Sequence, residues 1–181
     1  MLLGVADVFA TGLEDLAQAA DTEEFTIDTR DSPPIKQRPF KMGKREVEFL
    51  HKTVLGQLGA DIVRNSVSPW RSPAFVAYAR PYGTDGPPKM RKVIDYRRLN
   101  QVTREDSYPL PDIPELLEWF SESQYFGAID LKSGYWQART AVADQPKTAF
   151  VIPGSLYEYA RVPFGLKNAP AFFQRAITTT L

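Results

Sequence analysis

The sequence contains no cysteine and only one histidine, His51. The lack of cysteine excludes disulfide bonds, zinc centres of the thiolate type and thiol nucleophiles. A single histidine has no second ligand or nucleophile of its kind beside it, so we expect His51 to be a surface or packing residue. No stretch approaches the ~18 apolar residues that a membrane span needs, which predicts a protein with no membrane partner.

A secretion signal is also missing from the N-terminal residues 1–20. This stretch is partly apolar, but it has no basic beginning, and its apolar run is interrupted by Asp7, Glu14 and Asp15. We therefore expect an intracellular protein, in the cytoplasm or the nucleus, that is not secreted.

The 181 residues are 43% hydrophobic and 12% aromatic, which predicts one globular domain with a tail. The net charge of zero hides three unequal blocks. Residues 1–34 carry one basic against eight acidic side chains, residues 35–104 fifteen against five, and residues 105–181 six against nine. The basic central block is typical of a surface that binds a polyanion, or it is an ordinary solvated basic face.

Apolar spacing and turn residues predict the secondary structure. Three prolines and two glycines at 81–88 predict the turn of a hairpin with basic residues near its tip, which suits phosphate binding or simply solubility. The expected elements are an extended piece over 25–28, a helix over 44–58, hairpin strands over 74–79 and 89–96, a helix over 113–120, strands over 124–131, 136–142, 147–152 and 156–162, and a helix from 168 towards Leu181.

Asp130 is the most informative single residue. It ends a short apolar segment and precedes a tight turn and the aromatic ring of Tyr135. A carboxylate delivered in this way is typical of a metal-binding strand in a polymerase, although a turn or capping aspartate has the same local pattern.

Eight blocks of sequence resemble, in the same order, the reverse transcriptase of long-terminal-repeat retrotransposons of the Ty3/gypsy type. The resemblance covers nearly everything from Asp7 onward. The blocks are VFA at 8–10, IKQRP at 35–39, SPWRSP at 68–73, RKVIDYRRLN at 91–100, YPLP at 108–111, FGAIDLKSGYWQ at 126–137, PKTAF at 146–150 and VPFGLKNAPAFFQ at 162–174.

The resemblance implies an α+β fold, namely a partial right-hand polymerase with the fingers subdomain and an incomplete antiparallel-sheet palm. Residues 1–24 resemble the acidic connector between protease and polymerase in a polyprotein. Residues 25–181 would be the fingers and the N-terminal palm, without the C-terminal palm and the thumb. The implied function is RNA-directed DNA polymerisation, with an RNA or DNA template, a primer and deoxynucleoside triphosphates as partners.

The resemblance also assigns the catalytic and nucleotide-binding residues. Asp130 corresponds to the first of three catalytic aspartates, and the backbone carbonyl of Leu131 lies beside the second of two Mg²⁺ ions, which Mn²⁺ can replace. Tyr135 corresponds to the ring that excludes a ribose 2′-hydroxyl. Arg91 corresponds to the arginine along the incoming triphosphate. Arg80 either replaces a phosphate-binding lysine of the family or faces solvent.

The nucleic-acid contacts follow in the same way. Arg97 and Asn100 match residues that approach the template, and Phe164, Gly165 and Lys167 fall in the loop that lines nucleotide and template. Such phosphate contacts position nucleic acid without reading its sequence. For Arg97 and Lys167, an ordinary solvated surface position is the alternative interpretation.

The other two catalytic aspartates of the family form an adjacent pair, and the dipeptide Asp-Asp does not occur in this sequence. After Asp130 the acidic residues are Asp144 and Glu158. The sequence therefore predicts an inactive fragment with poor solubility, because part of the palm would lie open. The alternatives are a non-catalytic nucleic-acid-binding remnant and a degenerate product with no activity.

Overall fold

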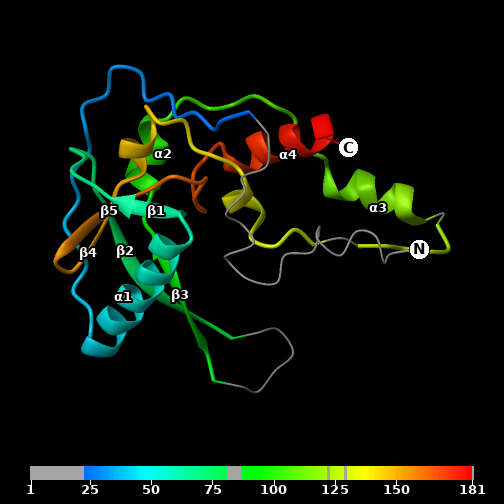
Figure 1. Ribbon diagram of the computed structural model, residues 1–181. Helices are drawn as coiled ribbons and strands as arrows, with labels where there is room; N and C mark the ends of the chain where they lie inside the picture. Colours follow the sequence, from blue (N-terminus) through cyan, green and yellow to red (C-terminus); the bar gives the residue numbers. More distant parts are fainter. Residues whose placement is uncertain (1–22, 81–86, 122, 129, 181) are drawn as a thin grey trace.

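The computed structural model describes residues 23–80, 87–121, 123–128 and 130–180. A five-stranded sheet carries helix α1 on one face, and three further α-helices lie around it (Figure 1). The predicted acidic leader over 1–24 lies outside the described residues, apart from Glu23 and Glu24.

The sheet joins two parts of the chain that are far apart in sequence. Its strands are β1 (Val63–Asn65), β2 (Ser72–Ala79), β3 (Lys89–Ile94), β4 (Phe150–Ile152) and β5 (Ser155–Tyr159), in the order β1-β5-β4-β2-β3. The β2–β4 pair is parallel and the other pairs are antiparallel, so the sheet is mixed. The predicted hairpin is present as β2 and β3.

Helix α1 (Lys44–Gly59) has nearly the predicted bounds. The carboxylate of Glu46 accepts the backbone N–H of Gly43 at 2.8 Å, which satisfies one of the free donors at the start of the helix. Leu50 and Val54, one turn apart, are fully buried and face the sheet. The helix contacts β1, β2, β3 and β4, and it therefore covers one face of the sheet.

Helix α2 (Arg97–Val102) was not predicted from the sequence. Its first turn is stabilised by Asp95, whose Oδ1 atom accepts the backbone N–H of Arg97 at 3.1 Å. Leu99 fixes the helix to the core and is almost completely buried. An aspartate two residues before a helix is a capping signal that the sequence analysis missed.

The strand predicted over 124–131 is wrong, because none of the described residues in that range belongs to a strand. A strand forms only where a partner offers backbone hydrogen bonds, and apolar composition cannot supply that partner. Tyr125 and Phe126, the apolar residues on which the prediction rested, are 92% and 67% exposed.

The strand predicted over 136–142 is also wrong. A 3₁₀ helix, η3 (Gly134–Gln137), occupies its start, followed by isolated bridges at Arg139 and Thr140. Ser133 has a left-handed backbone with φ 47°, and its carbonyl accepts the N–H of Trp136 at 2.7 Å. This tight turn excludes an extended backbone.

The strand predicted over 147–152 is only half present. The 3₁₀ helix η4 (Gln145–Thr148) precedes β4, because Pro146 has a fixed φ and no N–H to donate to a ladder. The predicted strand over 156–162 is confirmed in its first part by β5, which ends at Tyr159.

The last two α-helices differ in how much they bury. Helix α4 (Ala169–Thr180) buries Phe172, whose ring meets that of Phe25 edge-on at 5.2 Å. Helix α3 (Ile113–Ser121) has the predicted position but no buried residue, and it stands away from the sheet in Figure 1. Among the described residues, no helix is long and apolar enough to cross a membrane.

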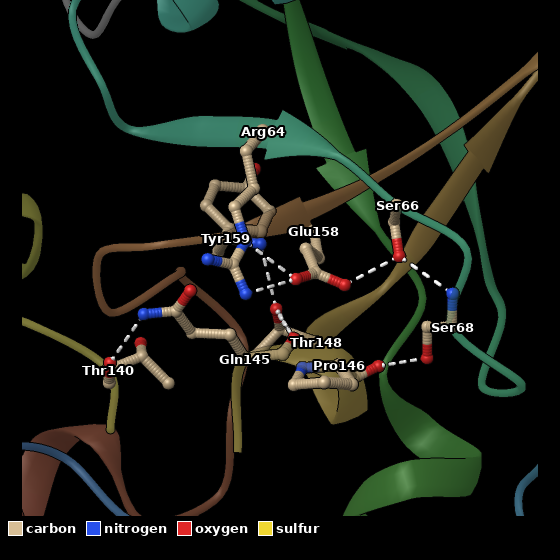
Figure 2. A network of polar contacts seen from close by, with 9 residues as sticks. All are labelled: Arg64, Ser66, Ser68, Thr140, Gln145, Pro146, Thr148, Glu158 and Tyr159. Atoms are coloured by element: carbon tan, nitrogen blue, oxygen red, sulfur yellow. Dashed lines mark hydrogen bonds and ion pairs between the residues drawn. The ribbon is translucent and has the colours of Figure 1, made fainter. Parts of the chain in front are cut away.

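A polar network fastens the β1 edge of the sheet to η4 (Figure 2). The carboxylate of Glu158 is 7% exposed and lies 2.7 Å from the Arg64 guanidinium. It also accepts the Ser66 hydroxyl at 2.5 Å. The Ser68 hydroxyl continues the network to the carbonyl of Pro146 at 2.6 Å. These bonds hold the loop after β1 in place.

Candidate functional site

Asn100 joins helix α2 to the loop that follows β5. Its Nδ2 atom donates to the carbonyl of Gly165 at 2.8 Å, and its Oδ1 atom accepts the N–H of Lys167 at 2.9 Å. Gly165 has φ 89°, a left-handed conformation in which a side chain would be strained. The two hydrogen bonds therefore fix a loop whose turn depends on glycine.

The cations of this region face solvent beside carboxylates. The guanidinium of Arg97 is 83% exposed and lies 2.8 Å from Asp95. The hydrogen bond to Asp95 raises the pKa of Arg97, and the same bond lowers the pKa of Asp95. Lys167 lies 3.3 Å from Glu105. For a phosphate to bind here, it would have to replace Asp95 and Glu105 as the ion-pair partners of Arg97 and Lys167.

The ring of Tyr135 is held between two other rings. It meets Phe164 at 5.0 Å and 61°, and Phe173 at 5.2 Å and 82°. Burial raises the pKa of its hydroxyl. The Trp136 ring also meets Phe164, at 5.9 Å. This aromatic cluster connects η3, the loop at 163–168 and α4.

Gly134 and Phe173 are part of this arrangement, and the sequence analysis missed both. A Cβ atom on Gly134 would lie 2.7 Å from the Phe173 ring, so the position has no room for a side chain. The glycine therefore permits the close approach of Phe173, which in turn packs against Tyr135. The only indication of this packing in the sequence is the glycine directly before Tyr135.

Arg91 lies on β3 and is exposed. It lines a hollow of about 470 Å³ together with Phe164 and Gly165. The predicted nucleotide residues Arg91, Phe164 and Gly165 thus share one concave surface. Arg80 follows the end of β2, is exposed, and is not among the described residues that line this hollow.

Lys92 also lines the hollow, and the sequence analysis did not assign it a site. Its ammonium group donates to Oε1 of Gln57 on α1 and lies 4.2 Å from the centre of the Phe150 ring. Burial lowers the pKa of Lys92 to about 7. The only sign of this burial in the sequence is that Lys92 directly precedes Val93 and Ile94, the apolar part of a predicted strand.

Asp130 and Leu131 are placed in exposed, non-regular backbone, and Leu131 is 44% exposed. Within the described ranges, no group of three or more His, Cys, Asp or Glu side chains could hold a metal ion. A carboxylate is a suitable ligand for Mg²⁺, which prefers oxygen. The described residues therefore show no complete two-metal site, and the role of Asp130 as a metal ligand stays a prediction.

The tryptophans were predicted to be core or packing residues. Trp70 is buried and Trp136 is half-buried, as expected, but Trp119 on α3 is 66% exposed and the prediction for it is wrong. Helix α3 has no buried residue, and the Trp119 ring shares this exposure.

Comparison with known proteins gives one family and a set of larger relatives. Residues 83–181 match the family described as reverse transcriptase (RNA-dependent DNA polymerase). The Retrovirus-related Pol polyprotein from transposon gypsy of Drosophila melanogaster is 41% identical over 158 residues, which is 86% of this chain. The chain spans only 15% of the length of that polyprotein.

Two solved structures have the same arrangement of the chain. The protease-reverse transcriptase of prototype foamy virus aligns with a TM-score of 0.77 and 22% identity, over 89% of this chain and 21% of the viral one. The foamy viral protease-reverse transcriptase in complex with an RNA/DNA hybrid aligns with a TM-score of 0.72 and 18% identity, with the same coverage. At these identities the likeness concerns the fold.

Proposed function

Because the chain belongs to the reverse transcriptase family, we propose that it forms the template-facing and nucleotide-facing part of an RNA-directed DNA polymerase from a retrotransposon polyprotein. The predicted membership of the Ty3/gypsy type is confirmed by the relatives, and the predicted α+β partial polymerase fold is confirmed by the structural neighbours. The roles of single residues are proposals.

The observation that carries the proposal is the double hydrogen bond of Asn100. It joins the loop of Gly165 and Lys167 to the helix that carries Arg97, so two segments with exposed cations are held together. Such a surface suits a nucleic-acid backbone, because cations that neutralise phosphates release counterions. The foamy viral neighbour solved with an RNA/DNA hybrid supports nucleic acid as the partner.

The nucleotide-facing part consists of Arg91 and the aromatic cluster. The guanidinium of Arg91 is exposed and free to pair with phosphate oxygens in a bidentate manner. The Tyr135 ring, packed between Phe164 and Phe173, has little freedom to move aside. A fixed ring at this point disfavours a ribose 2′-hydroxyl and so favours deoxynucleotides.

Divalent metal ions, when bound to such polymerases, activate the primer hydroxyl and neutralise the triphosphate. Here Asp130 is one fitting carboxylate ligand, and the described residues do not complete the set. We therefore propose that this chain binds template, primer and nucleotide but does not transfer the nucleotide by itself. The single carboxylate also favours a second candidate function, that of a non-catalytic nucleic-acid-binding module.

The binding proposal is tested with a fluorescent primer-template and the 181-residue chain at several salt concentrations. We expect Lys167→Gln to weaken binding about equally for different sequences and to reduce the salt slope by about one. Lys44→Gln is the matched control, because the Lys44 side chain is 92% exposed at the start of α1, away from this surface. No binding at low salt, or equal losses in both variants, would contradict the proposal.

A further inference from the structure

The hollow between α1 and β3 has the size and composition of a small-molecule site. Its volume of about 470 Å³ lies within the usual range for ligand pockets. Its wall is mostly apolar, and a few polar groups converge on it from α1 and β3. The apolar wall residues are Phe49, Met90, Val93, Ile94, Trp136 and Phe164.

Lys92 places a cation in this apolar wall. Its amine donates to Oε1 of Gln57 and lies over the rings of Phe150 and Tyr159, at 4.2 and 4.9 Å from their centres. A protonated lysine has three N–H donors, and Gln57 is its one hydrogen-bond partner within the described part of the chain. The amine therefore keeps donor capacity for an acceptor that enters the hollow.

Trp136 contributes its ring to the same wall. Its indole N–H is buried, so it is not the group that meets an entering ligand. The free donors of Lys92 in an apolar hollow thus point to a ligand that is apolar in its body and negatively charged or strongly polar at one end.

We propose that this hollow binds a flat aromatic molecule with a single carboxylate, which accepts hydrogen bonds from Lys92 while the aromatic body packs against the apolar wall. One ammonium neutralises one negative charge. A phosphate carries more charge and a larger hydration shell, so an apolar wall disfavours it. The hollow is also lined by Arg91, which we assign to the triphosphate, so the ligand shares this surface with the nucleotide and differs from it in placing a carboxylate at Lys92. Direct titration of a probe tests this inference without relying on the proposed polymerase function.

The affinity should depend on pH through Lys92. The groups that face its amine are Gln57 from α1, Phe150 from β4 and Tyr159 from β5. Burial raises the pKa of Tyr159, so this ring stays neutral. Free Lys92 has a pKa of about 7, and a bound carboxylate raises that pKa. Binding is thus strongest below pH 7 and weakens as the pH rises.

The test uses 2-naphthoate as the probe, titrated into the 181-residue chain by calorimetry between pH 6 and pH 9. We expect saturable binding at pH 6, binding of the neutral 2-naphthamide that is about tenfold weaker or more, and a loss of naphthoate affinity above pH 7. These three results need no variant. Equal affinities for the two probes, no pH dependence, or no saturable binding at pH 6 would overturn the proposal.

Two variants then locate the site. Lys92→Met keeps the length of the side chain and removes the ammonium, and we expect it to weaken naphthoate binding about tenfold and to abolish the pH dependence. Lys89→Met is the matched control, because Lys89 is exposed at the start of the same strand. An unchanged affinity in a folded Lys92→Met, verified by circular dichroism, would place the probe elsewhere, for example on the exposed apolar face of α3, and would contradict the proposal.

Discussion

The sheet with α1 and the segment from α3 to Asp130 have similar apolar side chains but opposite exposure. Phe150 and Ile152 on β4 are fully buried, whereas Ile113 and Leu117 on α3 are 69% and 63% exposed. The first pair lies between a helix and neighbouring strands, whereas the second pair belongs to a helix with no buried residue. Hydrophobicity therefore favours burial, but only a second surface provides it.

The largest difference should appear when one aromatic ring is removed from each region. Phe150→Ala leaves a cavity in the core and should lower the free energy of unfolding by about 3 to 5 kcal/mol. Phe126→Ala removes a ring that is 67% exposed and should change it by less than about 0.5 kcal/mol. Urea denaturation followed by circular dichroism measures both. Equal losses would mean that the two regions are packed alike.

The next difference concerns a buried and an exposed carboxylate. Glu158→Gln removes the charge that pairs with Arg64 and accepts the Ser66 hydroxyl, and it should cost about 1.5 to 3 kcal/mol (Figure 2). Glu115→Gln on α3 changes an exposed side chain and should be nearly neutral. The same denaturation experiment compares them, and a neutral Glu158→Gln would remove the network from the account of the sheet edge.

Stability should rise with pH because of one lysine of the sheet. Burial lowers the pKa of Lys92 to about 7 from the usual 10.5, so between these values the unfolded chain holds the extra proton. The wild-type chain should therefore gain about 1 kcal/mol between pH 7 and pH 8.

Two variants test whether Lys92 causes this gain in stability. Lys92→Met should remove it, whereas Lys132→Met, in the exposed segment, should leave it unchanged. Thermal unfolding at several pH values measures the effect. If the Lys92→Met variant still gains stability between pH 7 and pH 8, another titrating side chain must cause the gain.

The smallest change in stability is expected for Trp119→Ser. The ring is 66% exposed, so its removal should alter the free energy of unfolding by less than about 0.5 kcal/mol. It should nevertheless raise solubility, because it reduces an exposed apolar face. The concentration at which the chain precipitates measures its solubility. An unchanged value would indicate that the exposed apolar face of α3 does not cause aggregation.

The parts of the fold that could be predicted from the sequence were those that depend on residues close together in the chain. Apolar spacing located α1, and the turn residues located the hairpin of β2 and β3. The strand over 124–131 failed because its apolar residues have no pairing partner among the described residues, which no local pattern reveals. Helix α2 was missed because its start depends on a single side chain, Asp95.

The site was predictable as a set of residues but not as a geometry. Motif order predicted Asn100, Gly165 and Lys167 separately, and the structure joins them by two hydrogen bonds. The packing of Phe173 on Tyr135 and the burial of Lys92 depend on contacts between distant segments, so the sequence alone could not give them.

The most direct test of the account is primer extension by the 181-residue chain. The chain should bind a primer-template in a salt-dependent manner and add no deoxynucleotide in the presence of Mg²⁺ or Mn²⁺, because the described residues bring no cluster of three possible metal ligands together around the proposed ligand Asp130. Binding without extension is the predicted result. Extension that disappears in Asp130→Asn would contradict the claim that this chain lacks a working metal site.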